Sequence, residues 1–275
     1  MKELYSLSSK TTYIIKTKYY RFGCNGNRSL LACLTRFIAL GYQLDCGNYA
    51  LQQASDIAEN KTLSPDTAEI TSLYALQNCI IAYCGCYDTI LQIVYFGLDL
   101  SIPLYSKEDF QNAIKQCKWK SNDKGIIGIE DRLKQIPNNK TILELLNKLR
   151  ILFDDKRRGK VASYANNLKH GGGLLTNKFM HYISDIGFVN EEVEICINKD
   201  GSVKFNCPKE ITLFKTEWLY PKAVDIDVAI QQMYKQNEYI YMFADYFFSL
   251  MGFDQIDKLN LDEKYIIPFL NKNME

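Results

Sequence analysis

The most constraining feature of the sequence is a long, nearly charge-free segment that begins after Ser64-Pro65-Asp66. Serine accepts hydrogen bonds from free helix amides, proline fits the first helical position, and aspartate favours the positive end of the helix dipole. Behind this start, apolar residues recur at spacings of three and four, as in a buried helical seam: Leu73, Leu76, Ile80, Tyr83, Tyr87, Ile90 and Val94. We therefore predict a long core helix that ends near Gly97.

Charge and hydropathy argue against a membrane protein and against a global attraction to nucleic acid. The apolar run 73–98 is interrupted by polar residues, so it lacks the roughly 18 uncharged residues of a membrane span. With 33 basic and 32 acidic residues, the net charge is +1, and no overall field draws the chain to DNA or to anionic lipid. We expect no membrane contact, and any nucleic-acid contact has to be local.

The nine cysteines argue for reduced thiols in a cytoplasmic protein. They are scattered through apolar segments, which is not the pattern of a disulfide framework. Cys84 and Cys86 are two residues apart on a helix and therefore point about 200° away from each other. The other cysteines show no paired two-residue spacing, so the sequence predicts neither a metal site nor a cofactor.

Four further helices are predicted from the same periodicity. They cover residues 27–58 with Asn27 as N-cap, 107–118, 140–153, and a last long helix from Pro221 to Gly252. The first of them places Tyr42 in its apolar seam. The sequence thus predicts a mainly α protein, an antiparallel helical bundle, with a lead-in segment at 1–26 and one domain at 27–275.

Between residues 193 and 205 the hydrophobic period changes from helical to two. Asp200-Gly201 between the alternating runs is a strong signal for a hairpin turn. A third extended run at 211–219 is placed to join it. We predict a small β-hairpin insertion near 193–219, so that the domain contains a β insertion at about 190–220.

Chemistry that needs an imidazole must use one of two histidines, His170 or His181. His170 ends a predicted helix at 154–173, where Asn166 lies one turn before it and Lys169 beside it. Together with Arg157 and Arg158 these residues offer cations, an amide and a group that titrates near neutrality to a phosphate-bearing ligand. The alternative is structural, because a Lys-His pair before glycine is also what a helix C-terminus favours.

The run Tyr164-Ala165-Asn166-Asn167-Leu168-Lys169-His170 resembles the Asn-x-Leu-Lys-His endings of helical proteins similar to the HEPN superfamily. The resemblance covers about one helix and its flanks. In HEPN ribonucleases an arginine lies five to seven residues before the histidine, whereas here the nearest arginines are Arg157 and Arg158. The resemblance implies a metal-independent ribonuclease, or an inactive relative. In the active form, paired subunits surround the RNA phosphate and His170 assists proton transfer from the ribose 2′-hydroxyl.

Two functional hypotheses follow from the sequence. The first is a HEPN-like protein associated with RNA or a nucleotide, with His170 and Asn166 as catalytic residues and with Arg157, Arg158 and Lys169 as phosphate contacts. The second is a non-enzymatic helical interaction module whose Tyr-rich faces and β-hairpin bind another protein or a second copy of this chain. A homodimer is expected under the first hypothesis and is compatible with the second. His181 lies among apolar residues and is interpreted as a packed or interface residue.

Overall fold

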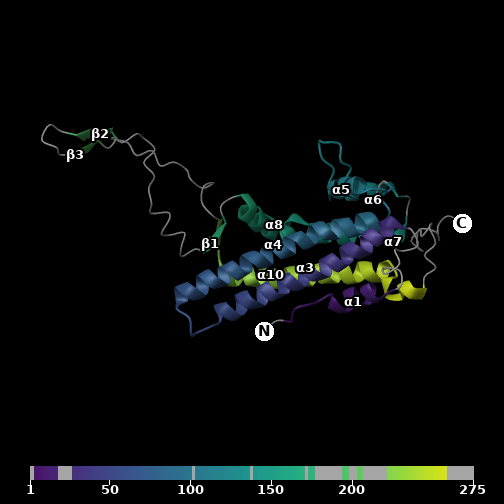
Figure 1. Cartoon of the computed structure of the whole chain (residues 1–275), viewed down its shortest axis with the longest axis horizontal. Helices are drawn as coiled ribbons and strands as arrows, with labels where there is room; N and C mark the ends of the chain where they lie inside the picture. The colour runs from purple at the N-terminus through teal and green to yellow at the C-terminus, as the bar shows by residue number, and fades with distance from the viewer. Residues whose placement is uncertain are drawn as a thin grey trace. The chain divides into compact units, whose positions relative to one another are not determined.

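The computed structural model describes residues 3–17, 27–100, 103–136, 139–170, 173–176, 194–197, 203–206 and 222–258. These residues are mainly helical (Figure 1), which confirms the mainly α part of the predicted fold class. The chain divides into two compact units, one of residues 1–165 with 226–275 and one of residues 166–225. The predicted division into a lead-in segment and a single domain stays a prediction.

The first unit is built on two long helices, α3 (Arg28–Ala58) and α4 (Pro65–Gly97). Both predicted caps are confirmed. The Asn27 side chain accepts a hydrogen bond from the amide of Leu30, and the Ser64 side chain accepts one from the amide of Thr67. The two helices run antiparallel along their whole lengths, because the Cys33 thiol donates to the Ile93 carbonyl at one end and the Ser72 hydroxyl donates to the Ala54 carbonyl at the other.

A glycine sets how closely the α3–α4 pair packs. A Cβ atom at Gly47 would lie 2.3 Å from Cε1 of Tyr83, so the backbone of α3 rests directly on this fully buried ring. Such contact distances exclude any side chain larger than hydrogen. The Tyr83 hydroxyl donates to Oδ1 of Asn48 at 2.7 Å, which fixes the ring beside the glycine.

Helix α10 (Ile226–Leu250) packs against α3, α4 and α7 (Lys140–Leu152), and α1 (Ser8–Lys16) packs against α3. The Tyr87 hydroxyl donates to Oε1 of Gln236 and so links α4 to α10. The core residues expected from the sequence are buried, as predicted: Leu76, Ile80, Tyr83, Tyr87, Ile90, Leu146, Leu149, Phe243 and Phe247.

Three shorter helices lie between α4 and α8 (Asp155–His170) in the sequence. Helix α5 (Lys107–Gln116) begins with a capping box between Ser106 and Asp109 and ends two residues before the predicted end. Helix α7 is capped by Asn139 and matches the predicted segment to within one residue. The intervening α6 (Ile129–Gln135) was not predicted. Beyond α10, a 3-10 helix, η2, covers Phe253–Lys258.

The second unit contains the end of α8 and two short strand pairs. Strand β1 (Leu174–Thr176) pairs in parallel with β4 (Lys222–Val224), and β2 (Glu194–Ile197) pairs antiparallel with β3 (Val203–Asn206). The turn predicted at Asp200-Gly201 and the extended run predicted at 211–219 lie outside the described residues. The hairpin insertion as a whole therefore stays a prediction.

Two details of the predicted helices are wrong. The last long helix begins at Ile226 and not at Pro221, because Lys222–Val224 pairs with β1 as a strand. Tyr42 was placed in the apolar seam of the first helix, yet its side chain is 62% exposed. It lies on the side of α3 that no described helix covers.

We predict that Gly47→Ala lowers the free energy of unfolding by about 1–3 kcal/mol, because the added methyl group overpacks the Tyr83 ring. Gly85→Ala is the matched control on α4, since its Cβ would lie 3.4 Å from the nearest atom of Gln43, an ordinary contact. The control is expected to be neutral or to stabilise by up to about 1 kcal/mol, from helix propensity alone. Urea unfolding measures both, and equal losses in the two variants would contradict the close approach.

Candidate functional site

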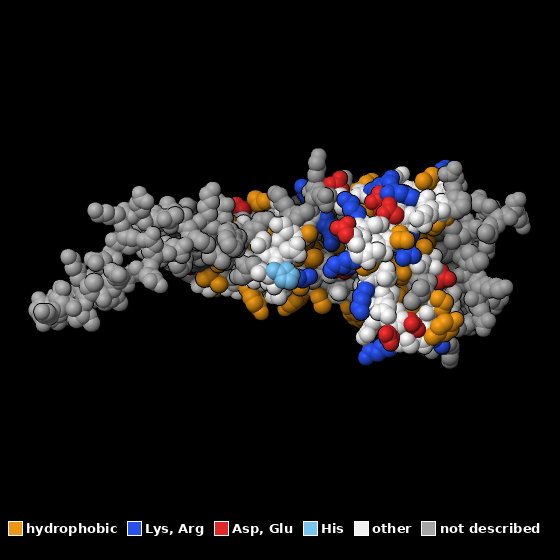
Figure 2. Space-filling view, turned by 90° about the horizontal axis from the view of Figure 1, so that it is seen from above, with side chains coloured by type: hydrophobic (Ala, Val, Ile, Leu, Met, Phe, Trp, Pro, Cys, Tyr) orange, Lys and Arg blue, Asp and Glu red, His pale blue; other side chains and the backbone are white. Residues whose placement is uncertain are grey.

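The residues predicted to form an active site are distributed along helix α8. Asn166, Lys169 and His170 are exposed at its C-terminal end, and the histidine (pale blue in Figure 2) lies at the surface. The predicted helix at 154–173 is observed from Asp155 to His170. After it, Gly173 has a φ of 109° and donates its amide to the Asn167 carbonyl at 3.3 Å, so the helix ends as a glycine-terminated helix does.

Arg158 makes contacts that the sequence did not predict. Its guanidinium carbon lies 5.1 Å from the centre of the Phe153 ring and 5.3 Å from that of the Tyr87 ring, which is cation–π geometry. Its Nε atom is buried and has no acceptor among the described residues. Burial raises the pKa of Tyr87 well above its usual range, and the neighbouring Arg158 partly opposes this shift. Tyr87 is therefore a neutral phenol that can donate to Gln236.

Helix geometry separates Arg158 from the exposed end of α8. His170 lies twelve positions after Arg158, which is about 18 Å along a helix. The structure thus gathers Asn166, Lys169 and His170 within about one turn, and it directs Arg158 to two aromatic rings. The side chain of Arg157 and all of His181 lie outside the described residues.

The first unit contains a polar cluster that sequence reasoning missed. Asn237 of α10 is almost fully buried, and its Nδ2 donates to Oδ1 of Asn48 at 2.7 Å. The same oxygen accepts from Tyr83. Burial raises the pKa of Tyr83 well above its usual range, so this phenol stays protonated and donates. A signal was present in the sequence, because Asn237 stands between Met233 and Ile240 at the spacing of an inward-facing helical seam.

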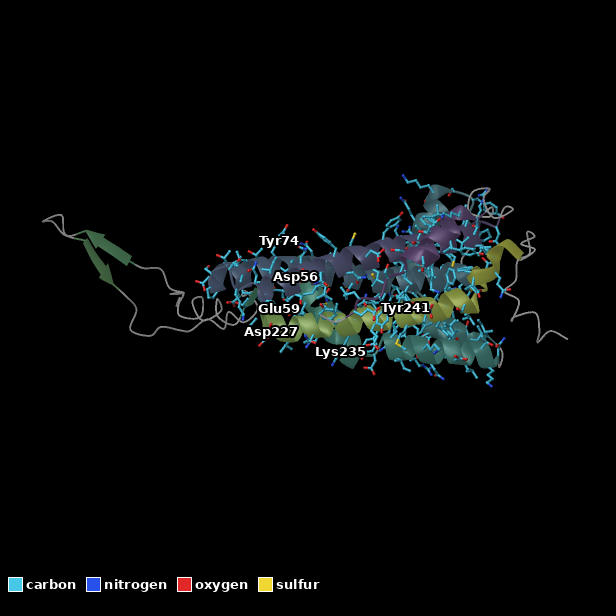
Figure 3. All side chains as sticks on the ribbon, turned by 90° about the horizontal axis from the view of Figure 1, so that it is seen from below. Asp56, Glu59, Tyr74, Asp227, Lys235 and Tyr241 are labelled. Atoms are coloured by element: carbon cyan, nitrogen blue, oxygen red, sulfur yellow. The ribbon has the colours of Figure 1, made fainter. Side chains whose placement is uncertain are left out.

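A second missed feature is a row of exposed aromatic and aliphatic side chains on the α3–α4 pair. Tyr42 and Tyr49 on α3 are 62% and 71% exposed, and Tyr74 and Ile81 on α4 are 68% and 40% exposed. We call these four residues the tyrosine face. In each helix the two residues are seven apart and so share one side. Tyr74 points away from α10 (Figure 3), which packs on the opposite side of the pair.

The α4 helix also tests the expectation on membranes. Among the described residues it is the helix with the length and apolar composition of a membrane span, and 72% of its most apolar window is buried inside the protein. A core helix of this length has the same composition. No group of histidine, cysteine or acidic residues suited to a metal ion occurs among the described residues.

One hollow of about 240 Å³ lies between α7 and α10. It is lined mainly by apolar side chains, with one cation at its edge: Lys148, Ile151, Leu152, Tyr239, Met242 and Phe243. The Lys148 ammonium group lies 4.5 Å from the centre of the Tyr246 ring and 3.9 Å from a carboxylate oxygen of Glu144. These local contacts account for its position, so the hollow offers an apolar depression and no charge that is free to bind an anion.

Comparison with models of protein families finds no matching family, and comparison with curated proteins and with solved structures likewise finds no match.

We predict that Arg158→Ala lowers the free energy of unfolding by about 1–2 kcal/mol, because it removes a partly buried cation from two aromatic rings and the packing of its stem. Lys169→Ala, in the exposed last turn of the same helix, is the control and should change stability by less than about 0.5 kcal/mol. Thermal unfolding measures both variants. A neutral Arg158→Ala would show that the guanidinium does not stabilise the fold.

Proposed function

We propose that this protein is a non-enzymatic helical interaction module, and that its tyrosine face binds a basic amphipathic helix of another protein. The observation that supports the proposal is the exposure of Tyr42, Tyr49 and Tyr74, each more than 60% accessible, on two rigid helices. Tyrosine supplies a large contact area at low entropic cost, and it is enriched at protein interfaces. Single exposed aromatic residues need no explanation, but three large exposed tyrosines on two adjacent helices do.

The shape of the face favours a helix as its occupant. The α3 and α4 helices also carry small, partly exposed residues, including Ala39, Ala82 and Gly85. A groove between two helices accepts the apolar stripe of a third, with anchors at helical spacing. On the other side of the pair, α10 already packs in this manner.

Charge favours a basic partner. Residues 37–97, which leave out the first nine residues of α3 and with them Arg28 and Arg36, hold six of the 32 acidic residues but only one of the 33 basic residues, Lys61. Aspartate and glutamate beside aromatic rings attract lysine and arginine, through ion pairs and cation–π contacts. The same carboxylates repel phosphates, which disfavours RNA or an anionic lipid surface as the occupant of this face.

We predict that a synthetic amphipathic helix, with leucines in one stripe and lysines along its flanks, binds the protein and that Tyr42→Ser/Tyr49→Ser/Tyr74→Ser weakens binding at least tenfold. Loss of three aromatic anchors removes well over the roughly 1.4 kcal/mol that this factor requires. Fluorescence anisotropy of the labelled peptide measures the affinity. Tyr105→Ser is the matched control, because Tyr105 is 78% exposed and lies just before α5, outside the tyrosine face.

Two outcomes would contradict the proposal. One is equal binding, or no binding, of the basic peptide and of a version with glutamate in place of lysine. The other is a dimer in solution that the triple serine variant dissociates, because the face would then serve self-association. A measurement of the protein's mass in solution detects such a dimer, and it also tests the homodimer expected from the sequence.

Association with RNA or a nucleotide is a second candidate, supported by the exposure of Asn166, Lys169 and His170 at the end of α8. An amide, an ammonium and an imidazole within about one helical turn suit a phosphate group. In this hypothesis His170 assists proton transfer without a metal, as in the HEPN ribonucleases that the sequence resembles, or the site binds without cleaving.

For this candidate we predict that RNA binds at low salt and that its affinity falls as the salt concentration rises. Lys169→Ala should reduce the slope of log affinity against log salt concentration by about one, the equivalent of one released counterion. His170→Ala should abolish any cleavage while RNA binding persists. Lys61→Ala is the control, since Lys61 is equally exposed and lies in the turn between α3 and α4. Absence of binding at low salt, or equal effects of the two lysine variants, would remove nucleic acid from consideration.

A further inference from the structure

The segment Tyr5–Ser8 lies against the first unit as a bound peptide lies in a receptor. We call this segment the strap. The Asn237 side chain accepts from the Tyr5 amide at 2.8 Å and donates to the Tyr5 carbonyl at 3.0 Å, so one amide group pairs with both backbone groups of one residue. Asn48 donates to the same carbonyl at 2.8 Å. Backbone pairing of this kind holds an extended segment whatever its side chain.

Side-chain contacts add sequence preference to this pairing. The Tyr5 ring stacks on Tyr241 of α10 with centroids 4.9 Å apart, and the Leu7 side chain is fully buried. The Ser6 and Ser8 hydroxyls each donate to one oxygen of Asp45, both at 2.7 Å. The pattern recognised is aromatic, serine, aliphatic, serine.

The receptor groups are rigid and belong to other helices. We call Asp45, Asn48, Asn237 and Tyr241 the peptide clamp. Two of them come from α3 and two from α10 (Figure 3 labels Tyr241). Asn48 and Asn237 are hydrogen-bonded to each other, and Asn48 also accepts from Tyr83, so their amides are held in place by contacts that do not involve the strap. Preorganised groups of this kind bind without a large ordering cost.

We propose that the peptide clamp is a peptide-binding site that exchanges its occupant, and that it accepts the strap of a second copy of this chain in place of its own. The occupant is a second strap because this segment satisfies all of the backbone and side-chain contacts just described. Exchange of an identical segment between two copies creates no new contact type and therefore costs little. The proposal uses no residue of the tyrosine face and does not depend on the proposed function.

In its own copy the strap is joined directly to the packed helix α1, which begins at Ser8, and so it competes strongly with any other occupant. A free peptide or a second copy therefore binds the wild-type protein weakly. Substitutions that weaken the strap and leave the peptide clamp unchanged should therefore make the clamp accessible to a free peptide. Tyr5→Ala/Ser6→Ala/Ser8→Ala does this, because all three residues are exposed while the buried Leu7 is left intact.

The test measures anisotropy of a labelled peptide with the sequence of residues 3–9. It should bind the strap-weakened variant at least tenfold more tightly than the wild type. Asp45→Ala in the strap-weakened background should reduce affinity at least tenfold, and Asp56→Ala, an exposed acid further along α3, should leave it within twofold. A peptide with alanine in place of Ser6 and Ser8 should bind at least tenfold more weakly. Equal binding to wild type and variant, or equal binding of the two peptides, would overturn the proposal.

A second measurement uses the wild-type protein, so that the proposal can be tested even if the strap-weakened variant does not fold. Wild-type protein at rising concentration should form a dimer that an excess of the serine-containing peptide dissolves and the alanine peptide does not. The tyrosine-face variant Tyr42→Ser/Tyr49→Ser/Tyr74→Ser should form the same dimer, which separates strap exchange from the proposed function. A monomer at all concentrations, or a dimer insensitive to both peptides, would overturn the exchange.

Discussion

The contact between α3 and α4 is the constraint on which the first unit depends. Because Gly47 has no side chain, the Tyr83 ring can lie against the backbone of α3. Tyr83 then donates to Asn48, and Asn48 accepts from Asn237 of α10. One close approach between two helices thus determines where a third helix can dock. The N-terminal strap depends on the same two asparagines.

The sequence predicted the long helices well because their signals are local. Asn27 and Ser64 cap the helices they were expected to cap, and the apolar spacing behind them gave ends close to those observed. The seven residues of α6 span about two turns, too few to show a period. The strand β4 was missed because Lys222–Val224 is extended only through its pairing with β1, a partner about 50 residues away in the sequence.

Periodicity assigns a residue to a face of a helix, but it does not say whether another element covers that face. Tyr42 illustrates this, since it follows the helical spacing of the seam and yet is exposed. The same limit applies to the candidate site. The sequence predicted a helix at 154–173, close to the observed Asp155–His170, whereas the contact of Arg158 with Tyr87 required knowledge of which helix lies beside α8. Asn237 was overlooked because an amide inside an apolar seam has a meaning only once its partners are known.

Among the residues that the structure describes, buried and exposed tyrosines differ in their surroundings. Tyr83 and Tyr87 are buried, so burial keeps their phenols neutral and each donates to an amide oxygen that positions a helix. Tyr42, Tyr49 and Tyr74 of the same two helices are instead exposed to solvent. A face used only to fold the chain would gain nothing from large aromatic side chains in water. The exposure of these rings is explained if a partner that brings both apolar surface and cations covers them.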